Sequence, residues 1–287
     1  MMTQSPAGRK LTVGLVQERW HPDAVRHRQR LRDGVLEAAR QQAQIICLQE
    51  LTLHPYFPVR PNADPALYAE TIPDGPTCRF ASDLAREAGA FITASLFEGV
   101  GPGYNTAVCF GPDGALLGKT RKQHIPSGPG YHEDMYFQAG DSDYPLHTLA
   151  GARVALPTCY DQWFPELARI YSLKGAELIV YPTAIGSEPT APDFDSEPLW
   201  EKVIVANGIM NNVFMIAVNR VGVEDGLIFY GSSFISDPLG QILVQAPRDE
   251  PAVLVAELDL GVREFWGRLF PFHRQRQPQT YHLLTQP

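Results

Sequence analysis

Hydrophobic positions near the start of the chain change from a continuous run to a helical spacing and back again. The apolar, β-branched residues 11–17 predict a strand. Residues 24–43 place Leu31 and Val35 at helical spacing, and residues 43–50 form a second short apolar run. A strand, an amphipathic helix and a strand in this order predict a parallel crossover unit, which is typical of an α/β protein.

The same pattern returns in the middle of the chain. Residues 153–159 and 177–181 are strand-like, and residues 165–174 between them predict a helix. Pro165 suits the first turn of this helix, and Gly175 suits its C-terminal end. A further helix is expected, and so are several strands that are separated by turns rich in Gly, Pro and Asp. The first three of these strands predict a hairpin region. The helix is expected at 196–211, and the strands are expected at 90–97, 106–110, 115–120, 213–218, 227–235, 241–245 and 252–259.

Composition and length agree with this pattern. The chain has 287 residues, of which 44% are hydrophobic and 20% are charged, and it has no Ser/Gly linker, low-complexity block or short repeat. We therefore expect a single α/β domain with mixed sheets over residues 1–287. Its core is expected at about residues 10–260, with a C-terminal tail at about residues 261–287 that lies at a subunit interface.

The charge balance and the hydrophobic runs limit the possible partners. The formal net charge is −8, whereas a nucleic-acid-binding protein would carry the opposite excess. The first ten residues are polar, and no run approaches the roughly 20 apolar residues that span a bilayer. These observations predict a cytoplasmic chain without nucleic-acid or membrane partners. The four cysteines show no C-x-x-C spacing, which argues against a zinc knuckle or a dithiol redox motif.

Three side chains with chemical potential follow predicted strands. They are Glu50, Lys122 and Cys159. Because ligands gather beyond the carboxyl ends of strands in open α/β sheets, a carboxylate, an ammonium and a thiol could meet at one sheet edge. Two of these residues also have a purely structural interpretation. Glu50 could cap a helix or form a salt bridge, and Lys122 lies in a basic cluster typical of a solvated surface.

The four cysteines differ in their surroundings. A cysteine is more often buried in a core than reactive, and Cys47 and Cys109, which have apolar neighbours, fit that interpretation. Cys78 lies in a polar stretch and has no assigned role. Cys159 lies at a predicted strand-to-helix turn, where a helix N-terminus lowers the pKa of a thiol. This position makes Cys159 the candidate nucleophile.

Three segments around these residues resemble the signature segments of the nitrilase superfamily of carbon–nitrogen hydrolases. They are Leu-Gln-Glu at 48–50, Arg-Lys-Gln-His-Ile-Pro at 121–126 and Cys-Tyr-Asp-Gln-Trp-Phe-Pro-Glu at 159–166. The order and spacing of the segments are similar too, and the resemblance covers nearly the whole chain. It implies an α/β fold of the four-layer αββα sandwich type, a Glu-Lys-Cys triad, no metal ion and no organic cofactor. It also implies a homo-oligomer, either a dimer or a larger assembly.

The resemblance implies a role for each member of the triad. Glu50 would act as general base towards Cys159, whose thiolate would attack the carbonyl carbon of an amide or carbamoyl group. Lys122 and a backbone N–H after the nucleophile would stabilise the oxyanion. Glu133 matches a second active-site glutamate of the family, which would position the substrate or Lys122. The alternative for Glu133 is a loop carboxylate in solvent.

Segments 128–131, 181–189 and 229–235 resemble the N-carbamoylputrescine amidase branch of this family. This resemblance implies hydrolysis of N-carbamoylputrescine to putrescine, CO2 and ammonia, a step of polyamine biosynthesis. Two alternatives stay open. One is a β-ureidopropionase-like enzyme or another aliphatic amidase of the family, and the other is a non-catalytic scaffold on the same fold.

The expected substrate contacts are Tyr160, Trp163 and Glu188. Relatives that act on N-carbamoyl amino acids carry Arg or His just after the catalytic cysteine, whereas this chain has Gln162 and Trp163 there. A substrate carboxylate would therefore find no cation. Glu188 could accept the distal ammonium of a cationic substrate, or it could simply be exposed to solvent.

Two positions depart from the pattern of this branch. Pro157 has no N–H to donate, so the predicted strand is expected to lose a ladder bond beside the nucleophile. Val-Ala-Asn-Gly at 205–208 stands where Gln-Gly-His-Ala is usual. This second departure predicts a changed pocket or subunit contact.

Overall fold

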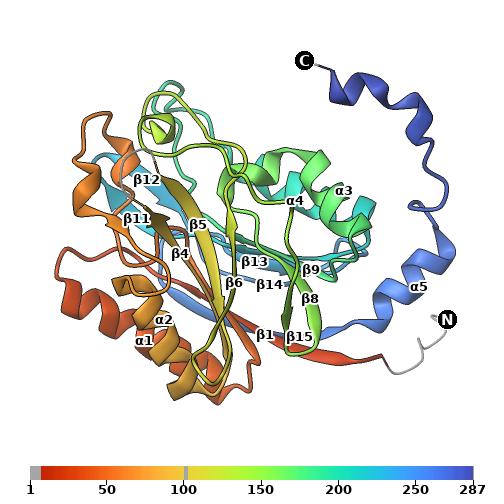
Figure 1. The fold of residues 1–287 in the computed structure, drawn as a ribbon, viewed down its shortest axis with the longest axis horizontal. Coiled ribbons are helices and arrows are strands. Elements are labelled where there is room, and N and C mark those ends of the chain that lie inside the picture. Colours follow the sequence, from red (N-terminus) through yellow and green to blue (C-terminus); the bar gives the residue numbers. More distant parts are fainter. Residues whose placement is uncertain (1–7, 100–102, 287) are drawn as a thin grey trace.

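The computed structural model of the chain describes residues 8–99 and 103–286 (Figure 1). Of the polar N-terminal segment at residues 1–10, residues 1–7 lie outside the described residues. The α-helices in it are α1 (Ala24–Arg40), α2 (Pro76–Ala88), α3 (Pro165–Leu173), α4 (Glu197–Asn211) and α5 (Gly261–Leu269). The strands in it are β1 (Lys10–Gln17), β2 (Ile45–Leu48), β3 (Ala69–Glu70), β4 (Phe91–Glu98), β5 (Tyr104–Phe110), β6 (Leu116–Arg121), β7 (His147–Leu149), β8 (Ala152–Ala155), β9 (Leu178–Pro182), β10 (Phe214–Val218), β11 (Val221–Glu224), β12 (Leu227–Tyr230), β13 (Phe234–Ser236), β14 (Ile242–Gln245) and β15 (Ala252–Asp259). None of the helices in this part of the chain is long and apolar enough to cross a membrane.

The strands form two large mixed sheets and a small ribbon. The first sheet has the order β15-β1-β2-β4-β5-β6 with β3 beside β4, the second has the order β14-β13-β10-β9-β8-β7, and β11 pairs with β12. β1 is parallel to β2, and β8 is parallel to β9, which confirms the two crossover units around α1 and α3. β4, β5 and β6 are antiparallel, which confirms the hairpin region.

Three apolar layers hold the sheets and helices together. Val13, Val154 and Ile216 belong to the layer between the two sheets. Leu31 of α1 belongs to the layer outside the first sheet, and Trp200 of α4 belongs to the layer outside the second. All five of these side chains are 0% exposed. Figure 1 shows α1 and α2 on one side of the sheets and α3 and α4 on the other, so the expected four-layer αββα sandwich is confirmed.

The segment before Cys159 differs from the expected strand over 153–159. Strand β8 ends at Ala155, and residues 156–158 lead to a short 3-10 helix, η4 (Cys159–Trp163), before α3 begins. Pro157 therefore lies beyond the strand, because a residue without an N–H cannot continue the ladder. The expected strand over 153–159 is therefore too long, and the expected loss of a ladder bond beside the nucleophile agrees with the early end of β8.

The expected strand over 227–235 is divided in two. Its first part is β12 of the small ribbon, and its second part is β13 of the second sheet. Gly231 and Ser232 both have φ of +54°, a left-handed conformation that no strand contains. The chain turns there from one sheet to another, which a continuous apolar run does not reveal.

Helix α2 was not expected from the sequence. Pro76 lies in its first turn, and Gly89, with φ of +61°, ends it, so the ordinary signals of a helix are present at both ends. Its buried face includes Cys78, which is 0% exposed. The cysteine that had no assigned role therefore has a core position.

Two buried histidines are expected to make stability depend on pH. His27 and His147 are 1% and 8% exposed, and burial lowers the pKa of each to about 4, from 6.5. Because the folded pKa is below the unfolded one, each neutral histidine contributes stability that is present above pH 6.5 and is lost as the pH falls towards 4. Urea titrations across this range should show the free energy of unfolding decreasing by up to about 3 kcal/mol per histidine. A His147→Gln variant should lose less stability, and an unchanged pH dependence in that variant would contradict the assignment.

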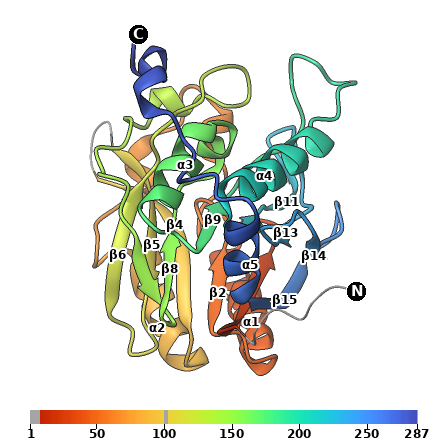
Figure 2. The ribbon, with the colours of Figure 1, turned by 90° about the vertical axis from the view of Figure 1, so that its right-hand side faces the viewer.

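The chain beyond α5 runs along one end of the molecule. Figure 2 shows α5 and the tail passing α3 on the way to the C-terminus. Ser172 Oγ of α3 lies 2.9 Å from Nε2 of His273 in this tail, whereas Leu283 and Leu284 are 70% and 67% exposed. The location of the tail at a subunit interface stays a prediction, as does the assignment of the whole chain to one domain.

Candidate active site

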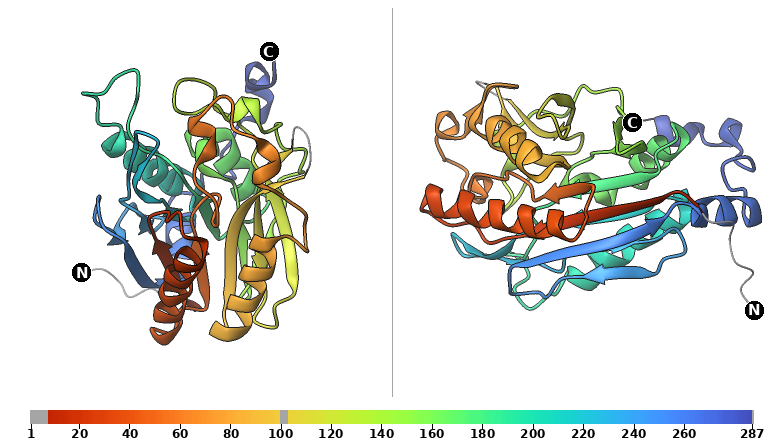
Figure 3. Two further views of the ribbon diagram at one scale, coloured as in Figure 1. Left: turned by 90° about the vertical axis from the view of Figure 1, so that its left-hand side faces the viewer. Right: turned by 90° about the horizontal axis from the view of Figure 1, so that it is seen from below.

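Glu50 lies two residues beyond β2 of the first sheet, over which the red helix α1 and the orange helix α2 lie side by side (Figure 3, left). Its side chain is 0% exposed. Oε1 accepts hydrogen bonds from Lys122 Nζ (2.9 Å) and from Asn105 Nδ2 (2.7 Å). The buried Oε2 has no hydrogen-bond partner among the described residues. One carboxylate oxygen is thus held in place, while the other is free to accept a proton.

Lys122 follows β6 and is 0% exposed, so its interpretation as part of a solvated basic surface is wrong. Its Nζ lies 2.8 Å and 2.7 Å from the two carboxylate oxygens of Glu133 and 2.9 Å from Glu50 Oε1. Burial lowers the pKa of Lys122, but the charges of Glu133 and Glu50 outweigh burial and raise the pKa above its ordinary value. The side chain is therefore an ammonium held between two carboxylates.

Glu133 begins the short 3-10 helix η3 (Glu133–Met135) and is 0% exposed, which excludes a loop carboxylate in solvent. Besides Lys122, it accepts a hydrogen bond from the hydroxyl of Tyr56 (2.7 Å). Burial raises the pKa of Glu133, Lys122 opposes this, and the charge of Glu50 raises it further, so the pKa lies above its ordinary value. The pKa of Tyr56 is raised by burial and by Glu133, so its hydroxyl stays a donor.

Cys159 is the first residue of η4 and has φ of +44°, a left-handed conformation that is uncommon for a residue other than glycine. It is 5% exposed, and Sγ lies 3.7 Å from the carbonyl oxygen of Ala184. Burial and the charge of Glu50 raise the pKa of the thiol well above 9.0, against the effect of Lys122. The prediction of a lowered pKa is wrong, because α3 begins only at Pro165 and burial dominates. This thiol therefore needs a base to become a nucleophile.

The other three cysteines are buried in apolar layers. Cys47 belongs to the layer between the sheets, and so does Cys109, which confirms the core interpretation of both. Cys78 belongs to the layer under α1 and α2. Burial raises the pKa of each of these thiols to about 12. All four cysteines are free thiols.

Asp161 is a residue of the site that the sequence analysis missed. Its carboxylate is 1% exposed and accepts the backbone N–H groups of Thr158 (3.0 Å) and His124 (2.8 Å). It also lies 2.9 Å from His124 Nδ1. Asp161 therefore ties the turn that carries Cys159 to the segment that carries Lys122. The sequence signal that could have identified Asp161 is its position two residues after the candidate nucleophile Cys159.

A cavity of about 410 Å³ opens beside Cys159. The three expected substrate contacts all line it: Tyr160, which is 36% exposed, and Trp163 and Glu188, which are half-buried. The other lining residues are Tyr56, Pro126, Ser127, Gly128, Pro129, Tyr131, Glu133, Ala184, Ile185 and Thr190. Within this described lining there is no arginine and no lysine. Because Glu188 is half-buried in the cavity wall, its position favours contact with a ligand over simple exposure to solvent.

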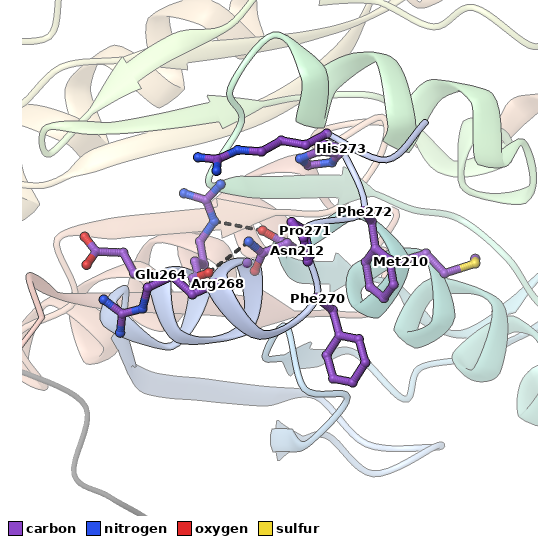
Figure 4. Close-up of a pocket in the computed structure, with 11 residues that line it drawn as sticks. Met210, Asn212, Glu264, Arg268, Phe270, Pro271, Phe272 and His273 are labelled. Atoms are coloured by element: carbon purple, nitrogen blue, oxygen red, sulfur yellow. Dashed lines mark hydrogen bonds between the residues drawn. The ribbon is translucent and has the colours of Figure 1, made fainter. Parts of the chain in front are cut away.

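A second cavity, of about 400 Å³, lies between α5 and the C-terminal end of α4 (Figure 4). Arg263 and Asn212 cross it with two mutual hydrogen bonds, Arg263 Nε to Asn212 O (2.8 Å) and Asn212 Nδ2 to Arg263 O (2.9 Å). Its lining includes Phe270 and Phe272 but none of the predicted site residues. The candidate active site is therefore the cavity beside Cys159.

The segment 205–208 lies behind the nucleophile. Asn207 is 2% exposed, and its Nδ2 donates to the carbonyl oxygen of Gln162 (3.1 Å) in η4. None of these four positions lines the cavity beside Cys159. Asn207 therefore supports the nucleophile turn and does not form the wall of that cavity, and a changed subunit contact stays a prediction.

The described residues contain no group of three or more His, Cys, Asp and Glu side chains that could hold a metal ion. The described side chains next to the cavity include a thiol, an ammonium and the carboxylates of Glu50 and Glu133. This set is suited to proton transfer and nucleophilic attack on a carbonyl carbon.

Comparisons with known proteins agree with this chemistry. A family model described as carbon–nitrogen hydrolase matches residues 12–268. A citrullinase from Francisella tularensis is 36% identical over 280 residues, which are 94% of this chain and 96% of that protein. An N-carbamoylputrescine amidase from Arabidopsis thaliana is 39% identical over 263 residues, which are 87% of each protein.

Solved structures show the same similarity. A carbon–nitrogen hydrolase from Helicobacter pylori G27 has a TM-score of 0.85 and 32% identity, and the match covers 97% of this chain and 99% of that one. An amidase from Nesterenkonia sp. has a TM-score of 0.78 at 23% identity over 97% of each chain, a likeness that concerns the fold alone.

Proposed function

We propose that this chain, which belongs to the carbon–nitrogen hydrolase family and is an amide-hydrolysing enzyme, cleaves the ureido group of a small cationic substrate by means of Cys159. The observation that supports this proposal is the buried Lys122 ammonium between Glu50 and Glu133, beside a cavity that Cys159 lines. Since the family and its relatives are hydrolases, the non-catalytic scaffold has no support. N-carbamoylputrescine is the substrate that we favour.

The first step is nucleophilic attack. Glu50 Oε2, which has no partner in the described residues, takes the proton of Cys159 Sγ as the sulfur bonds to the carbonyl carbon. The carbonyl oxygen becomes an oxyanion, and the nearby Lys122 ammonium stabilises its charge. Glu133 holds that ammonium with both oxygens, so the positive charge is fixed before the reaction begins.

The second half of the reaction returns the thiol. Collapse of the tetrahedral intermediate breaks a carbon–nitrogen bond, and the leaving nitrogen takes the proton that Glu50 received. Glu50 then removes a proton from water, which attacks the thioester and releases Cys159 as a thiol. When the amine leaves first, the other product is carbamic acid, which decomposes to CO2 and ammonia. Glu50 therefore takes a proton twice and returns it twice: the proton of Sγ goes to the leaving nitrogen, and the proton of water goes back to Sγ.

The lining of the cavity favours a cation over an anion at the distal end of the substrate. Glu188 is half-buried in the wall, and none of the described lining residues is a lysine or an arginine. A primary ammonium could therefore pair with Glu188, whereas a carboxylate would be desolvated without a partner. N-carbamoylputrescine presents a ureido group at one end and only an ammonium at the other.

Citrulline is the second candidate. A relative named citrullinase is 36% identical and covers 94% of this chain. Citrulline carries the same ureido group and a distal ammonium, but it also carries a carboxylate. The wall described above gives that carboxylate no cation, so we expect citrulline to be the poorer substrate.

Glu188→Gln should separate recognition of the distal cation from the chemical step. Loss of a charge-assisted hydrogen bond is expected to raise KM for N-carbamoylputrescine about tenfold or more, with kcat changed little. Steady-state kinetics with N-butylurea provide the matched comparison, because this substrate has the same chain without the ammonium. Its KM should be unchanged by the substitution. An equal rise of KM for both substrates would contradict pairing of Glu188 with the ammonium.

The test of the proposed function is ammonia release from the purified protein. N-carbamoylputrescine, L-citrulline and N-carbamoyl-β-alanine should be offered in parallel, and kcat/KM should be compared. We expect kcat/KM for N-carbamoylputrescine to exceed that for L-citrulline and that for N-carbamoyl-β-alanine by about tenfold or more. The reason is that the carboxylate of either of these two substrates would be buried without a partner. A preference for either carboxylate, or no turnover of N-carbamoylputrescine, would overturn the proposed substrate class.

A further inference from the structure

Arg220 joins the second sheet to the segment that carries Glu50 in the first. It follows β10, and its side chain is 0% exposed. Its Nη2 donates to the main-chain oxygen of Glu50 (2.7 Å) and lies 3.2 Å from those of Leu51 and His54. A single planar guanidinium group therefore contacts the backbone of the proposed base and of the turn that follows it.

This turn needs external support. Leu51 has φ of +48°, a left-handed conformation that a side chain beyond glycine rarely adopts. Such conformations persist where the surrounding structure imposes them. The contacts of Arg220 with the carbonyl oxygens of Glu50, Leu51 and His54 lie on both sides of the unusual dihedral angle. They fix the direction in which the chain leaves β2, and with it the position of Glu50.

Glu224 extends the same network to the second carboxylate of the site. Its Oε1 accepts Arg220 Nη1 (2.7 Å), and its Oε2 accepts the backbone N–H of Tyr56 (2.7 Å). The hydroxyl of Tyr56 in turn donates to Glu133 Oε1 (2.7 Å). The buried carboxylate of Glu224 on the ribbon strand β11 is thus connected through Arg220 to the main chain of Glu50 and through Tyr56 to the carboxylate of Glu133.

We infer that Arg220 and Glu224 are positioning residues that set the relative positions of Glu50 and Glu133 and so determine the reactivity of Cys159. The inference rests on the proposed function, in which Glu50 is the base. Neither residue is among those that line the active-site cavity, so each acts through the groups that it holds and not through contact with substrate. The small β11–β12 ribbon is then a support of the catalytic groups.

The experiment measures the rate at which iodoacetamide alkylates Cys159, followed by mass spectrometry of the peptide that contains it. This rate needs no substrate, so it does not depend on which amide the enzyme hydrolyses. Glu224→Gln keeps the size of the side chain but removes the charge that orients Arg220. We expect it to slow alkylation of Cys159 by about 10- to 100-fold, by analogy with the loss of groups that orient metal ligands. The kcat for N-carbamoylputrescine should fall by a similar factor, with KM unchanged.

Asp225→Asn is the matched control on the same ribbon. Asp225 pairs with Arg60 at the surface, where the two side chains are 41% and 58% exposed, and its φ of +47° is one that asparagine tolerates. This control should leave the alkylation rate unchanged. Arg220→Lys is a second test that also covers the case in which Glu224→Gln does not fold. A lysine keeps the charge but cannot contact Glu224 and the three carbonyl oxygens together, so slower alkylation is expected again.

A purely structural role predicts a different pattern. Glu224→Gln and Arg220→Lys would then lower the unfolding midpoint but leave alkylation and kcat unchanged below the transition, and this result would overturn the inference while leaving the proposed function intact. A wild-type Cys159 that reacts no faster than the core thiol Cys47 would contradict Glu50 as base, and the inference would be lost with it. Slower alkylation in both variants with a normal control supports the inference.

Discussion

Replacing Cys159 with alanine should lower kcat for N-carbamoylputrescine by about 10⁶-fold, because removal of a covalent nucleophile removes the whole catalysed path. Cys159 is the one cysteine among the described residues that line the cavity. Its raised pKa means that the thiol reacts only with help from the neighbouring base Glu50. The measurement is ammonia release at saturating substrate. Residual activity within about tenfold of the wild type would exclude a thiol mechanism.

Cys47→Ala is the matched control for this substitution. Cys47 is buried like Cys159, but it lies between the two sheets, and burial raises its pKa to about 12. We expect this variant to keep its kcat and to lose about 1–2 kcal/mol of unfolding free energy, since it creates only a small cavity. The two cysteine variants should therefore separate chemistry from packing.

Lys122→Met should damage both activity and stability. The loss of a preorganised positive charge at the oxyanion is expected to lower kcat about 10²–10³-fold. Glu50 and Glu133 would remain buried without their shared cation, which should lower the free energy of unfolding by about 3–5 kcal/mol. Steady-state kinetics and urea unfolding measure the two effects separately.

Two further variants test this explanation of Lys122. Adding Glu133→Gln to Lys122→Met removes one of the unpaired charges, so the double variant should regain part of the lost stability but none of the lost kcat. Lys119→Met changes a lysine on the neighbouring β6 strand that pairs with Glu98 and is 39% exposed, and it should cost no more than about 1 kcal/mol. A double variant that is less stable than Lys122→Met, or a kcat that recovers, would contradict an electrostatic role for Lys122.

The three residues of the proposed triad could be predicted from the sequence because each follows a recognisable strand. Glu50 and Lys122 lie just beyond β2 and β6 of the first sheet, whereas Cys159 follows β8 of the second sheet, so the expectation that all three meet at one sheet edge is wrong. The ion pair of Lys122 with Glu50 bears out the expected proximity of these two side chains. Their catalytic roles stay proposals.

The supporting residues could not be predicted because their partners are distant along the chain. Tyr56 contacts Glu133 across 77 positions, and Arg220 contacts the main chain of Glu50 across 170 positions. No local pattern of hydrophobic and polar residues contains such pairs. The pKa of Cys159 was misjudged for a related reason, since its burial depends on segments from several parts of the fold.

Local patterns also failed where the backbone turns inside an apolar run. The run over 153–159 continues beyond Ala155, but the lack of an N–H at Pro157 is one reason why the strand is shorter. The run over 227–235 contains a turn at Gly231 and Ser232, where two positive φ angles send the chain to another sheet. Hydrophobicity alone reports burial, and both sides of each turn are buried.

The central claim is that Cys159 forms a covalent intermediate with the carbon of a ureido group. It is tested most directly by quenching wild-type enzyme with acid during turnover of N-carbamoylputrescine and measuring the masses of its cysteine peptides. We predict a carbamoyl or N-(4-aminobutyl)carbamoyl group on Cys159, with Cys47, Cys78 and Cys109 unmodified. Turnover in which the Cys159 peptide never gains mass, while Cys159→Ala remains active, would contradict the account.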